Sequence, residues 1–149
     1  MPEGAALVLE RVGKRFGAAR VLRNVDAAFP RGTVTLVTGG NGAGKSTLLK
    51  IMAGLSRPSA GRVLRAGAGE EGGAEPTLGY VGHATFLYPG LTALENLAFW
   101  RRAHGFRPDG AALLALLERV GLAAHAHERA RVFSRGMAQR LNLARVLML

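Results

Sequence analysis

A glycine-rich motif in the first third of the chain constrains the fold more than any other feature. Residues 39–46 read GGNGAGKS and satisfy the pattern G-x-x-x-x-G-K-S/T. The residues before the motif, 33–38, are β-branched and mostly apolar, which predicts a strand covered on both faces. The residues after it, 45–53, carry apolar side chains at helical spacing, and Gly54 is placed to end that helix. A strand, a glycine loop and a helix in this order predict an α/β fold.

The chemistry of phosphate binding explains the residue types in this motif. Glycines allow backbone N–H groups to turn toward phosphate oxygens, and the start of a helix adds partial positive charge. Lys45 is suited to neutralising β- and γ-phosphates, and the hydroxyl of Ser46 is suited to binding Mg²⁺. The alternative from the residues alone is a glycine turn that binds nothing. The predicted nucleotide site comprises Gly39, Gly40, Asn41, Gly42, Ala43, Gly44, Lys45, Ser46 and Thr47, with Lys45 in a catalytic role and Ser46 as metal ligand.

Short apolar runs on either side of the motif predict further strands. Two runs near the N-terminus are separated by a glycine-containing turn, which favours an antiparallel hairpin or small sheet. A Gly- and Glu-rich stretch further along has nothing to bury and predicts a mobile surface loop. We expect strands at 7–12, 21–29, 61–64 and 78–81, the turn at 13–17, and the surface loop at 66–76.

Helical periodicity replaces the strand pattern in the last third of the chain. Thr92 and Glu95 form the capping-box pattern that begins a helix. Asp109 is placed to cap a second helix that stops at Gly121, and Ser134 is placed to open a third. The expected helices span 92–105, 109–121 and 134 onward, and the last has Met137, Leu141, Ala144 and Met148 on one face.

Two segments of the chain together resemble the ABC-type ATPases. Residues 39–50 are similar to the Walker A segment of that family, with Gly40 where the family usually has Pro. Residues 133–141 are similar to the ABC signature, in which Ser134 and Gly136 match the pattern and open a helix. Ser and Gly at a helix start are again suited to anion binding. Phe133, Arg135 and Met137 depart from the family's commonest residues at those positions.

The resemblance implies an α/β P-loop NTPase of the ABC ATPase type, with an antiparallel β subdomain and a helical subdomain, here incomplete. The implied divisions are 1–90 for the β subdomain and phosphate-loop core, 91–133 for the helical subdomain, and 134–149 for the start of the signature helix.

Two single residues also take an implied role from the resemblance. Phe16 falls where the family places an aromatic ring that stacks on adenine, a use that needs only a π face. His83 falls at the Q-loop position, where most members have a glutamine near Mg²⁺ and the attacking water. The alternatives are a strand-end Phe buried in a small core and an ordinary surface histidine.

The family resemblance implies partners and a location as well. Two ATPase subunits would sandwich ATP and Mg²⁺ between the Walker A segment of one and the signature of the other, which implies a homodimer or pseudo-dimer. The helical subdomain would contact transmembrane transporter subunits, so the protein is expected to be cytoplasmic and peripheral on the plasma membrane. Residues 80–83 and 91–97 are similar to the haem-exporter ATPases of bacterial cytochrome c maturation, which implies export of haem. ATP-binding subunits of multidrug, polysaccharide or other ABC exporters are the alternative.

Composition excludes several other classes of protein. The chain has no cysteine, which excludes disulfides and thiol catalysis, and no apolar run long enough for a membrane-spanning helix. The N-terminus lacks the basic-then-apolar order of a signal peptide, which favours the cytoplasm.

A formal net charge of +10 raises the alternative of a nucleic-acid partner. The basic residues are scattered, with no more than two adjacent. An RNA-associated ABC ATPase of translation would carry two ATPase domains and a basic linker, and neither is visible. A P-loop kinase or GTPase would need no Ser-Gly helix start after a helical insert. We therefore expect no nucleic-acid partner.

The acidic residues that hydrolysis requires are not evident. In the ABC family a Walker B strand ends in Asp and is followed by Glu, which activates water, and then by a switch histidine. The two aspartates here are Asp26, which precedes the phosphate loop, and Asp109, which caps a helix. We expect an ABC-type ATPase in the full-length family member. This chain is expected to be a truncated domain that binds nucleotide and does not hydrolyse ATP alone.

Overall fold

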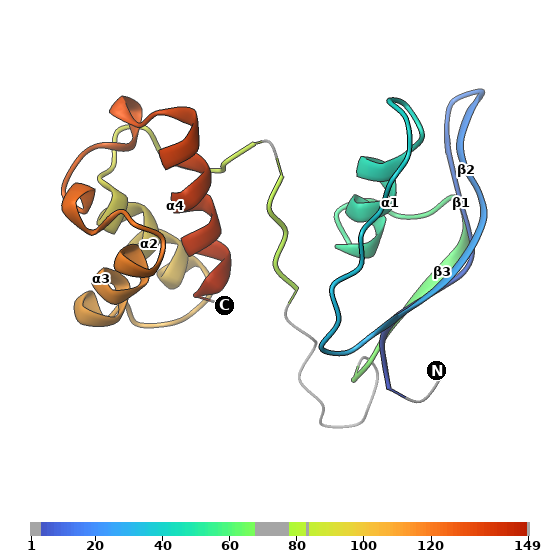
Figure 1. The fold of residues 1–149 in the computed structure, drawn as a ribbon, viewed down its shortest axis with the longest axis horizontal. Coiled ribbons are helices and arrows are strands. Elements are labelled where there is room, and N and C mark those ends of the chain that lie inside the picture. The colour runs from blue at the N-terminus through green and yellow to red at the C-terminus, as the bar shows by residue number, and fades with distance from the viewer. Residues whose placement is uncertain (1–3, 68–77, 83, 149) are drawn as a thin grey trace. The chain divides into compact units, whose positions relative to one another are not determined.

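The structure of the chain, a computed structural model, forms two compact units. It describes residues 4–67, 78–82 and 84–148, and the units are Met1–Leu78 and Gly79–Leu149 (Figure 1). Each unit is described by itself below. The surface loop predicted at 66–76 lies, from residue 68 onward, outside the described residues. The subdomain boundary expected at 90/91 stays a prediction.

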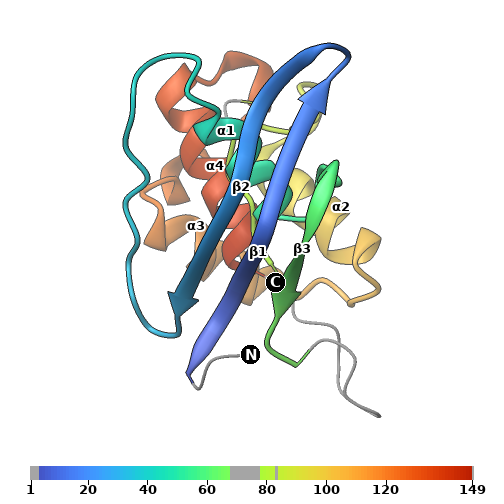
Figure 2. The ribbon, with the colours of Figure 1, turned by 90° about the vertical axis from the view of Figure 1, so that its right-hand side faces the viewer.

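The first unit contains a three-stranded antiparallel sheet in the order β2-β1-β3 (Figure 2). The predicted hairpin and third strand are therefore confirmed, but the turn predicted at 13–17 is wrong. The first strand continues through Gly13 with register shifts, and the chain turns at Gly17, whose φ is +57°. The turn was predicted too early because glycine is common in turns, but a strand also accepts glycine at a β-bulge. The elements of this unit are β1 (Ala5–Phe16), β2 (Ala19–Pro30), α1 (Lys45–Met52) and β3 (Ala60–Arg65).

Helix α1 packs its apolar face against this sheet. Ile51 is fully buried there, and Leu48 and Met52 pack against the same cluster. Gly54 follows with a φ of +75°, which confirms the predicted end of the helix. The buried residues of this core are Leu7, Leu9, Val12, Leu22 and Ile51. The core fixes the helix that follows the phosphate loop.

The two strands predicted at 33–38 and 78–81 do not form. Both runs lack strand structure, and no backbone hydrogen bond joins residues 33–38 to another described segment. Val34 is 100% exposed and Leu36 is 83% exposed, so the expected cover on both faces is absent. The strand predictions are wrong because composition favours strand formation, whereas a strand exists only when a neighbour pairs with it. Among the described residues no such neighbour is present.

Such an unpaired apolar run is a template for pairing with other chains. We predict that Val34→Lys reduces concentration-dependent aggregation and changes the free energy of unfolding by no more than about 0.5 kcal/mol, because the side chain contacts nothing it could lose. Light scattering and denaturant titration measure the two effects. Val132→Lys is the matched control, since Val132 is also exposed and apolar but lies at the end of a 3-10 turn. An equal reduction of aggregation in both variants would show that the added charge alone, and not the unpaired run, accounts for the effect.

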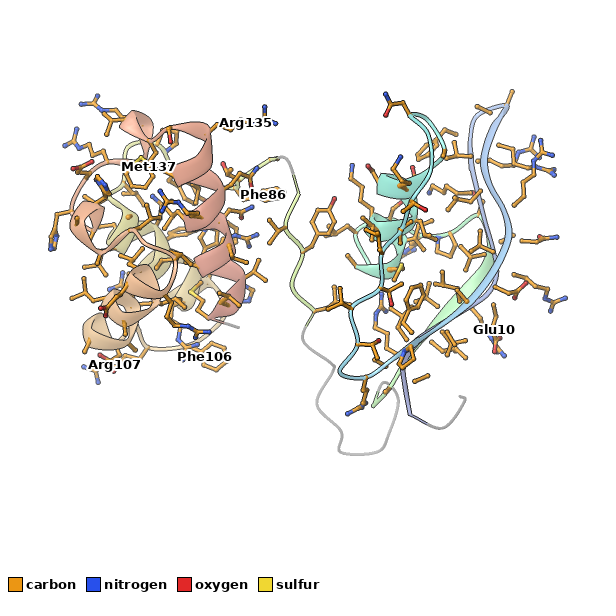
Figure 3. All side chains as sticks on the ribbon, in the orientation of Figure 1. Glu10, Phe86, Phe106, Arg107, Arg135 and Met137 are labelled. Atoms are coloured by element: carbon orange, nitrogen blue, oxygen red, sulfur yellow. The ribbon has the colours of Figure 1, made fainter. Side chains whose placement is uncertain are left out.

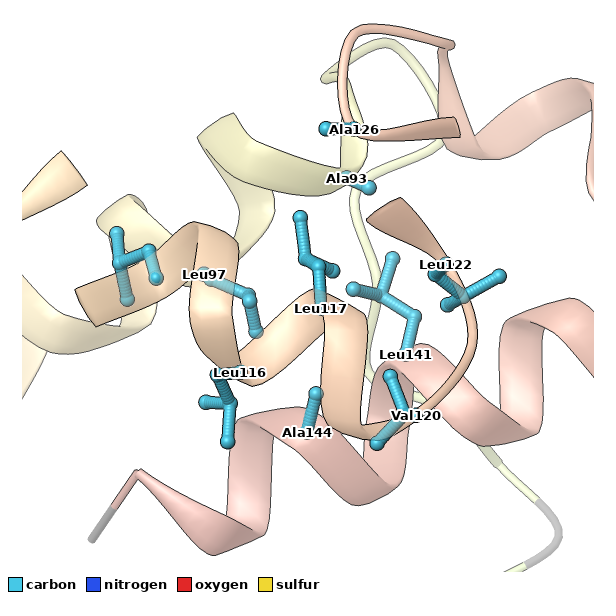
Figure 4. Close-up of a cluster of buried hydrophobic side chains, with 10 residues drawn as sticks. Ala93, Leu97, Leu116, Leu117, Val120, Leu122, Ala126, Leu141 and Ala144 are labelled. Carbon is cyan, nitrogen blue, oxygen red and sulfur yellow. The ribbon is translucent and has the colours of Figure 1, made fainter. Parts of the chain in front are cut away.

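The second unit is helical, and its three α-helices enclose one core. Figure 4 shows leucine and alanine side chains from the helices and the segment after α3 meeting at its centre. Leu97, Leu117 and Leu141 are fully buried in this cluster, so one residue from each α-helix anchors the packing. The elements are α2 (Ala93–Ala103), α3 (Gly110–Arg119), the 3-10 turns η1 (Ala123–His125) and η2 (Ala130–Val132), and α4 (Arg135–Leu147).

The predicted helix starts in this unit are confirmed. Thr92 and Glu95 form a complete capping box, with the Glu95 N–H donating to Thr92 Oγ1 at 3.1 Å and the Thr92 N–H donating to Glu95 Oε2 at 2.8 Å. Asp109 accepts from the Ala111 N–H at 3.0 Å, and Ser134 caps α4. These contacts involve residues two or three positions apart, which is why the sequence alone predicts them.

The capping box makes the second unit sensitive to acid. Hydrogen bonds from the Thr92 backbone and side chain lower the pKa of Glu95 below its ordinary value. The ionised Glu95 carboxylate therefore stabilises the folded state fully at pH values above its unfolded-state pKa. This stabilisation is lost as the pH falls through the lower pKa that Glu95 has in the folded state. We predict that Glu95→Gln lowers the thermal midpoint at neutral pH and that this difference disappears under strongly acidic conditions. Circular dichroism across that pH range measures it, with Glu118→Gln, an exposed residue on α3, as the control.

Candidate functional site

The phosphate-loop motif forms an exposed loop that leads into α1. Its backbone has positive φ at Gly39 (+142°), Gly42 (+79°) and Gly44 (+89°), conformations that L side chains rarely adopt. Gly44 is the N-cap of α1, and no side chain caps this helix start. By contrast, side chains cap α2, α3 and α4. The first N–H groups of α1 therefore have no side-chain acceptor, which suits them to an anion.

Lys45 closes the loop from the first turn of α1. Its Nζ donates to the carbonyl oxygen of Gly39 at 2.8 Å and to that of Gly40 at 2.7 Å. The ammonium group is thus held over the loop by two neutral acceptors. Phosphate oxygens bind an ammonium group more strongly than neutral carbonyls do. The arrangement can exchange these two acceptors for an incoming phosphate without moving the helix.

Gly44 is packed directly against the hairpin. A Cβ at this position would lie 2.9 Å from Leu22 Cδ2 and 3.2 Å from the Val21 carbonyl oxygen. Only glycine fits this contact, which joins the end of the loop to β2. The sheet core therefore holds the loop in place although residues 33–38 are unpaired.

The Ser46 hydroxyl proposed for the metal and its neighbour Thr47 lie directly after the loop. Ser46 is exposed and Thr47 is partly buried in the first turn of α1. Within the described parts of the chain, no group of three or more His, Cys, Asp or Glu side chains could hold a metal ion. A divalent cation at this site would therefore depend on the Ser46 hydroxyl together with oxygens of the bound phosphates.

Phe16 is not part of a core. Its side chain is 56% exposed at the end of β1, and Lys14 Nζ lies 5.0 Å from the ring centroid. Lys14 on β1 is paired with Leu22 on β2, and Leu22 is the side chain that a Cβ at Gly44 would approach most closely. The structure thus places Phe16 in the same unit as the loop, with its side chain more than half exposed. This excludes the alternative of a buried strand-end residue, and the adenine role remains a proposal.

The signature residues begin α4 in the second unit. Ser134 Oγ accepts from the Met137 N–H at 3.2 Å, and both Ser134 and Gly136 are exposed. Figure 3 labels Arg135 and Met137 in this first turn of the helix. Ser134 and Gly136 belong to the second unit, and the phosphate loop belongs to the first. His83, the residue at the proposed Q-loop position, lies outside the described residues.

Two buried polar residues on α4 were not predicted from the sequence. Asn142 is fully buried, and Arg145 is 9% exposed although arginine is normally solvent-accessible. A signal was present, because Arg145 lies four residues after Leu141 and three before Met148, on the apolar face of the helix. A charged residue on the apolar face of a helix indicates a side chain that is buried together with polar partners.

The first unit has a glycine loop that enters an uncapped helix packed on an antiparallel sheet, and the second unit is helical. Together these features define a partial P-loop domain of the α/β class. The family model described as ABC transporter matches residues 22–149, so the chain belongs to the ABC transporter family.

Curated relatives of two kinds are similar to the chain. The cytochrome c biogenesis ATP-binding export protein of Alkalilimnicola ehrlichii is 39% identical over 94% of the chain and 61% of the relative. The corresponding protein of Rhizobium meliloti is 37% identical over 95% of the chain and 70% of the relative. An aliphatic sulfonates import ATP-binding protein of Pseudomonas fluorescens is 37% identical over 97% of the chain and 52% of the relative. The chain thus spans about half to two thirds of the length of these relatives.

Solved structures support the same fold. An ATP binding subunit of an ABC transporter superimposes with a TM-score of 0.77 at 27% identity, over 96% of the chain and 62% of that structure. CbiO1 of Clostridium perfringens, part of an ABC transporter complex, gives 0.74 at 23% identity, over 97% of the chain and 62% of that structure, which shows likeness of fold alone. The α/β fold expected from the sequence is therefore confirmed as that of a partial ABC ATPase domain.

Proposed function

We propose that the chain is the nucleotide-binding part of an ABC transporter ATPase and that it binds ATP with Mg²⁺ at residues 39–47. The observation that carries this proposal is the uncapped start of α1 together with the Lys45 ammonium group held over the loop. Both features offer positive charge and free donors to a polyphosphate. Calorimetric titration of this chain and of its Lys45→Ala variant with ATP and Mg²⁺ tests the proposal.

Each residue of the site has a separate task in this proposal. The loop N–H groups and Lys45 bind the β- and γ-phosphates, and the Lys45 charge stabilises the transferring phosphoryl group. Ser46 would hold Mg²⁺, which when bound neutralises charge on the phosphates. The exposed ring of Phe16 would stack on adenine. Ser134 and Gly136 would meet the γ-phosphate held by a partner ATPase subunit, and His83 would act at the Q-loop position.

Binding without turnover is the expected behaviour of this chain by itself. The sequence contains no Asp-Glu pair after an apolar strand that could hold Mg²⁺ and activate water. We predict that its steady-state phosphate release equals that of the Lys45→Ala variant. A malachite-green assay with both proteins at equal concentration measures this. Release several times faster than in the variant would mean that other residues supply the missing general base.

The transported substrate is proposed to be haem, exported for cytochrome c biogenesis. Relatives whose names state cytochrome c biogenesis and export support this proposal at 37–39% identity. Relatives named for the import of aliphatic sulfonates are similarly close, at 37–42% identity, and they favour a second candidate with the opposite direction of transport. Exporters of drugs or polysaccharides remain an alternative from the family resemblance.

A gene deletion in the source organism distinguishes these candidates. If the protein serves haem export, the deletion strain loses covalently bound haem in its c-type cytochromes on haem-stained gels. Its growth with an aliphatic sulfonate as sole sulfur source is then unchanged. The reverse pattern identifies a sulfonate importer. Normal cytochromes and normal sulfonate growth would contradict both candidates.

The whole transporter is proposed to contain transmembrane subunits and two ATPase subunits, peripheral on the cytoplasmic face of the plasma membrane. In the described part of the chain, no helix combines the length and apolarity that crossing a membrane requires. A homodimer or pseudo-dimer is proposed because, in the family that the chain resembles, the residues at Ser134 and Gly136 close on the γ-phosphate held by a partner subunit.

A further inference from the structure

Four cations gather around one cavity at the hairpin end of the sheet in the first unit. Figure 2 shows β1 and β2 running side by side toward the turn that joins them. The cavity at this end has a volume of about 440 Å³. Its charged lining residues are Lys14 and Arg15 on β1 and Arg20 and Arg23 on β2, and its neutral lining residues are Gly13, Leu22, Asn24, Ser59 and Ala60. The described lining therefore carries four positive charges and no carboxylate.

Two of these cations face each other across the hairpin. Arg15 and Arg20 are directly opposite residues of the β1–β2 ladder. Like charges in such a pair destabilise a sheet, because their Cβ atoms lie only about 5 Å apart. Neither arginine forms an ion pair with a carboxylate in the described parts of the chain. The folded hairpin thus contains a repulsion that a bound anion would relieve.

The strand pairing is irregular where the cavity lies. The register of β1 against β2 shifts on both sides of Lys14, and the register of β1 against β3 shifts between Glu10 and Gly13. Asn24 on β2 has a φ of +42°. Irregularities of this kind bend a strand and change the direction of its side chains, and they are frequent beside active sites. Gly13 contributes no side chain, which leaves room in the cavity.

The backbone around the cavity is fixed, whereas its guanidinium groups are available. Lys14 Nζ donates to the Arg57 carbonyl oxygen at 2.6 Å, and the Arg15 N–H donates to Ser59 Oγ at 3.1 Å. These two bonds tie β1 to the segment before β3. Among the described residues, no carboxylate pairs with the exposed guanidinium groups of Arg15, Arg20 and Arg23. They offer planar sets of N–H donors to a ligand.

We propose that this cavity binds the phosphate group of a second anionic ligand, separate from the nucleotide at residues 39–47. Guanidinium groups match phosphate oxygens with paired N–H donors, and the phosphate charge offsets the repulsion between Arg15 and Arg20. Neither Phe16 nor any residue of the phosphate loop lines the cavity. Free phosphate compounds and the headgroups of anionic lipids share this chemistry, and the experiments below distinguish the two sources.

Titration with inorganic pyrophosphate tests for a free ligand. All proteins carry Lys45→Ala, which weakens the phosphate loop. The cavity variant adds Arg15→Gln and Arg20→Gln, and calorimetry should show a loss of pyrophosphate affinity of about tenfold or more. The control variant adds Arg11→Gln and Arg31→Gln, which are exposed arginines of the same unit outside this cavity. It should change the affinity less than about twofold, because exposed charges outside the site are screened.

Vesicle sedimentation with the same proteins tests for a lipid headgroup. The vesicles contain phosphatidylcholine with or without phosphatidylglycerol. If the ligand is a lipid, the binding that depends on phosphatidylglycerol falls about tenfold in the cavity variant and less than about twofold in the control variant. A loss specific to the cavity variant in either assay supports the proposal and identifies the source. Equal losses in the two variants, or no loss specific to the cavity variant in either assay, would overturn it.

Thermal unfolding tests the repulsion itself. In dilute buffer without phosphate, the cavity variant should unfold at the same temperature as its Lys45→Ala parent or at a higher one, because the like-charge pair is gone. Added pyrophosphate or lipid, whichever binds, should then raise the midpoint of the parent more than that of the variant. A lower midpoint of the variant in dilute buffer would show that the two arginines stabilise the hairpin without a ligand, and would overturn the proposal.

Titration with ATP separates this cavity from the nucleotide site. In the chain with Lys45 intact, Arg15→Gln and Arg20→Gln together should change the affinity for ATP less than about threefold. A loss as large as that of Lys45→Ala would make the cavity part of the nucleotide site and would overturn the proposal. A chain that binds pyrophosphate or lipid as expected but does not bind ATP refutes the proposed function alone.

Discussion

Replacing Lys45 with alanine is expected to weaken ATP binding about thirtyfold or more. In the structure the Lys45 ammonium group donates to two loop carbonyls at 2.7–2.8 Å, and a phosphate can replace both acceptors. A hydrogen bond to a charged group contributes about 1.5–3 kcal/mol, and about 2 kcal/mol corresponds to this factor. Isothermal titration calorimetry with ATP and Mg²⁺ measures the affinity of both proteins.

Lys50 provides a matched control on the same helix. It is exposed in the last turn of α1, and its side chain makes no contact with the loop carbonyls that bind Lys45. Lys50→Ala removes the same charge and should change the affinity less than threefold. Similar losses of affinity in the two variants would mean that ATP binding depends on the overall charge of the chain rather than on the phosphate loop. If neither variant loses affinity for ATP, the phosphate loop is not part of the ATP-binding site.

The helical unit was predictable from sequence because its signals are local. The capping box at Thr92 and Glu95, the Asp109 cap and the Ser134 cap each connect residues two or three positions apart. Their geometry depends little on the rest of the chain. The loop glycines were predictable for the same reason, since positive φ at Gly42 and Gly44 is a local requirement.

The strand-forming run at 33–38 shows where this reasoning fails. Its composition predicts a covered strand, but cover and pairing come from segments distant in sequence. In the described residues those neighbours are missing, and Val34 is fully exposed. The environment of Arg145 was unpredictable for the same reason, because Tyr80 and Phe86 approach it from about sixty residues away. Local patterns thus predicted the loop and the caps, whereas non-local pairing determined the sheet and the buried cation.

A series of alanine substitutions should separate backbone strain from packing in the loop. Gly40 has no positive φ, and a Cβ there meets no atom within 4 Å. Gly42 has a φ of +79° but open space around it, whereas Gly44 has both a φ of +89° and close neighbours. We predict losses of unfolding free energy of about 0.5 kcal/mol or less at Gly40, about 1–2 kcal/mol at Gly42 and about 2–4 kcal/mol at Gly44.

ATP binding should fall in the same order, because Gly44→Ala moves the loop away from β2 while Gly40→Ala leaves it in place. Denaturant titration and calorimetry on the three variants measure both quantities. Combining Gly44→Ala with Leu22→Ala removes the nearest side-chain contact, at 2.9 Å. It leaves the Val21 carbonyl oxygen at 3.2 Å and the positive φ unchanged, so only part of the binding should return. Full recovery in the double variant would show that side-chain packing alone selects glycine at position 44. Equal effects at Gly40 and Gly44 would mean that the contact with the hairpin does not position the loop.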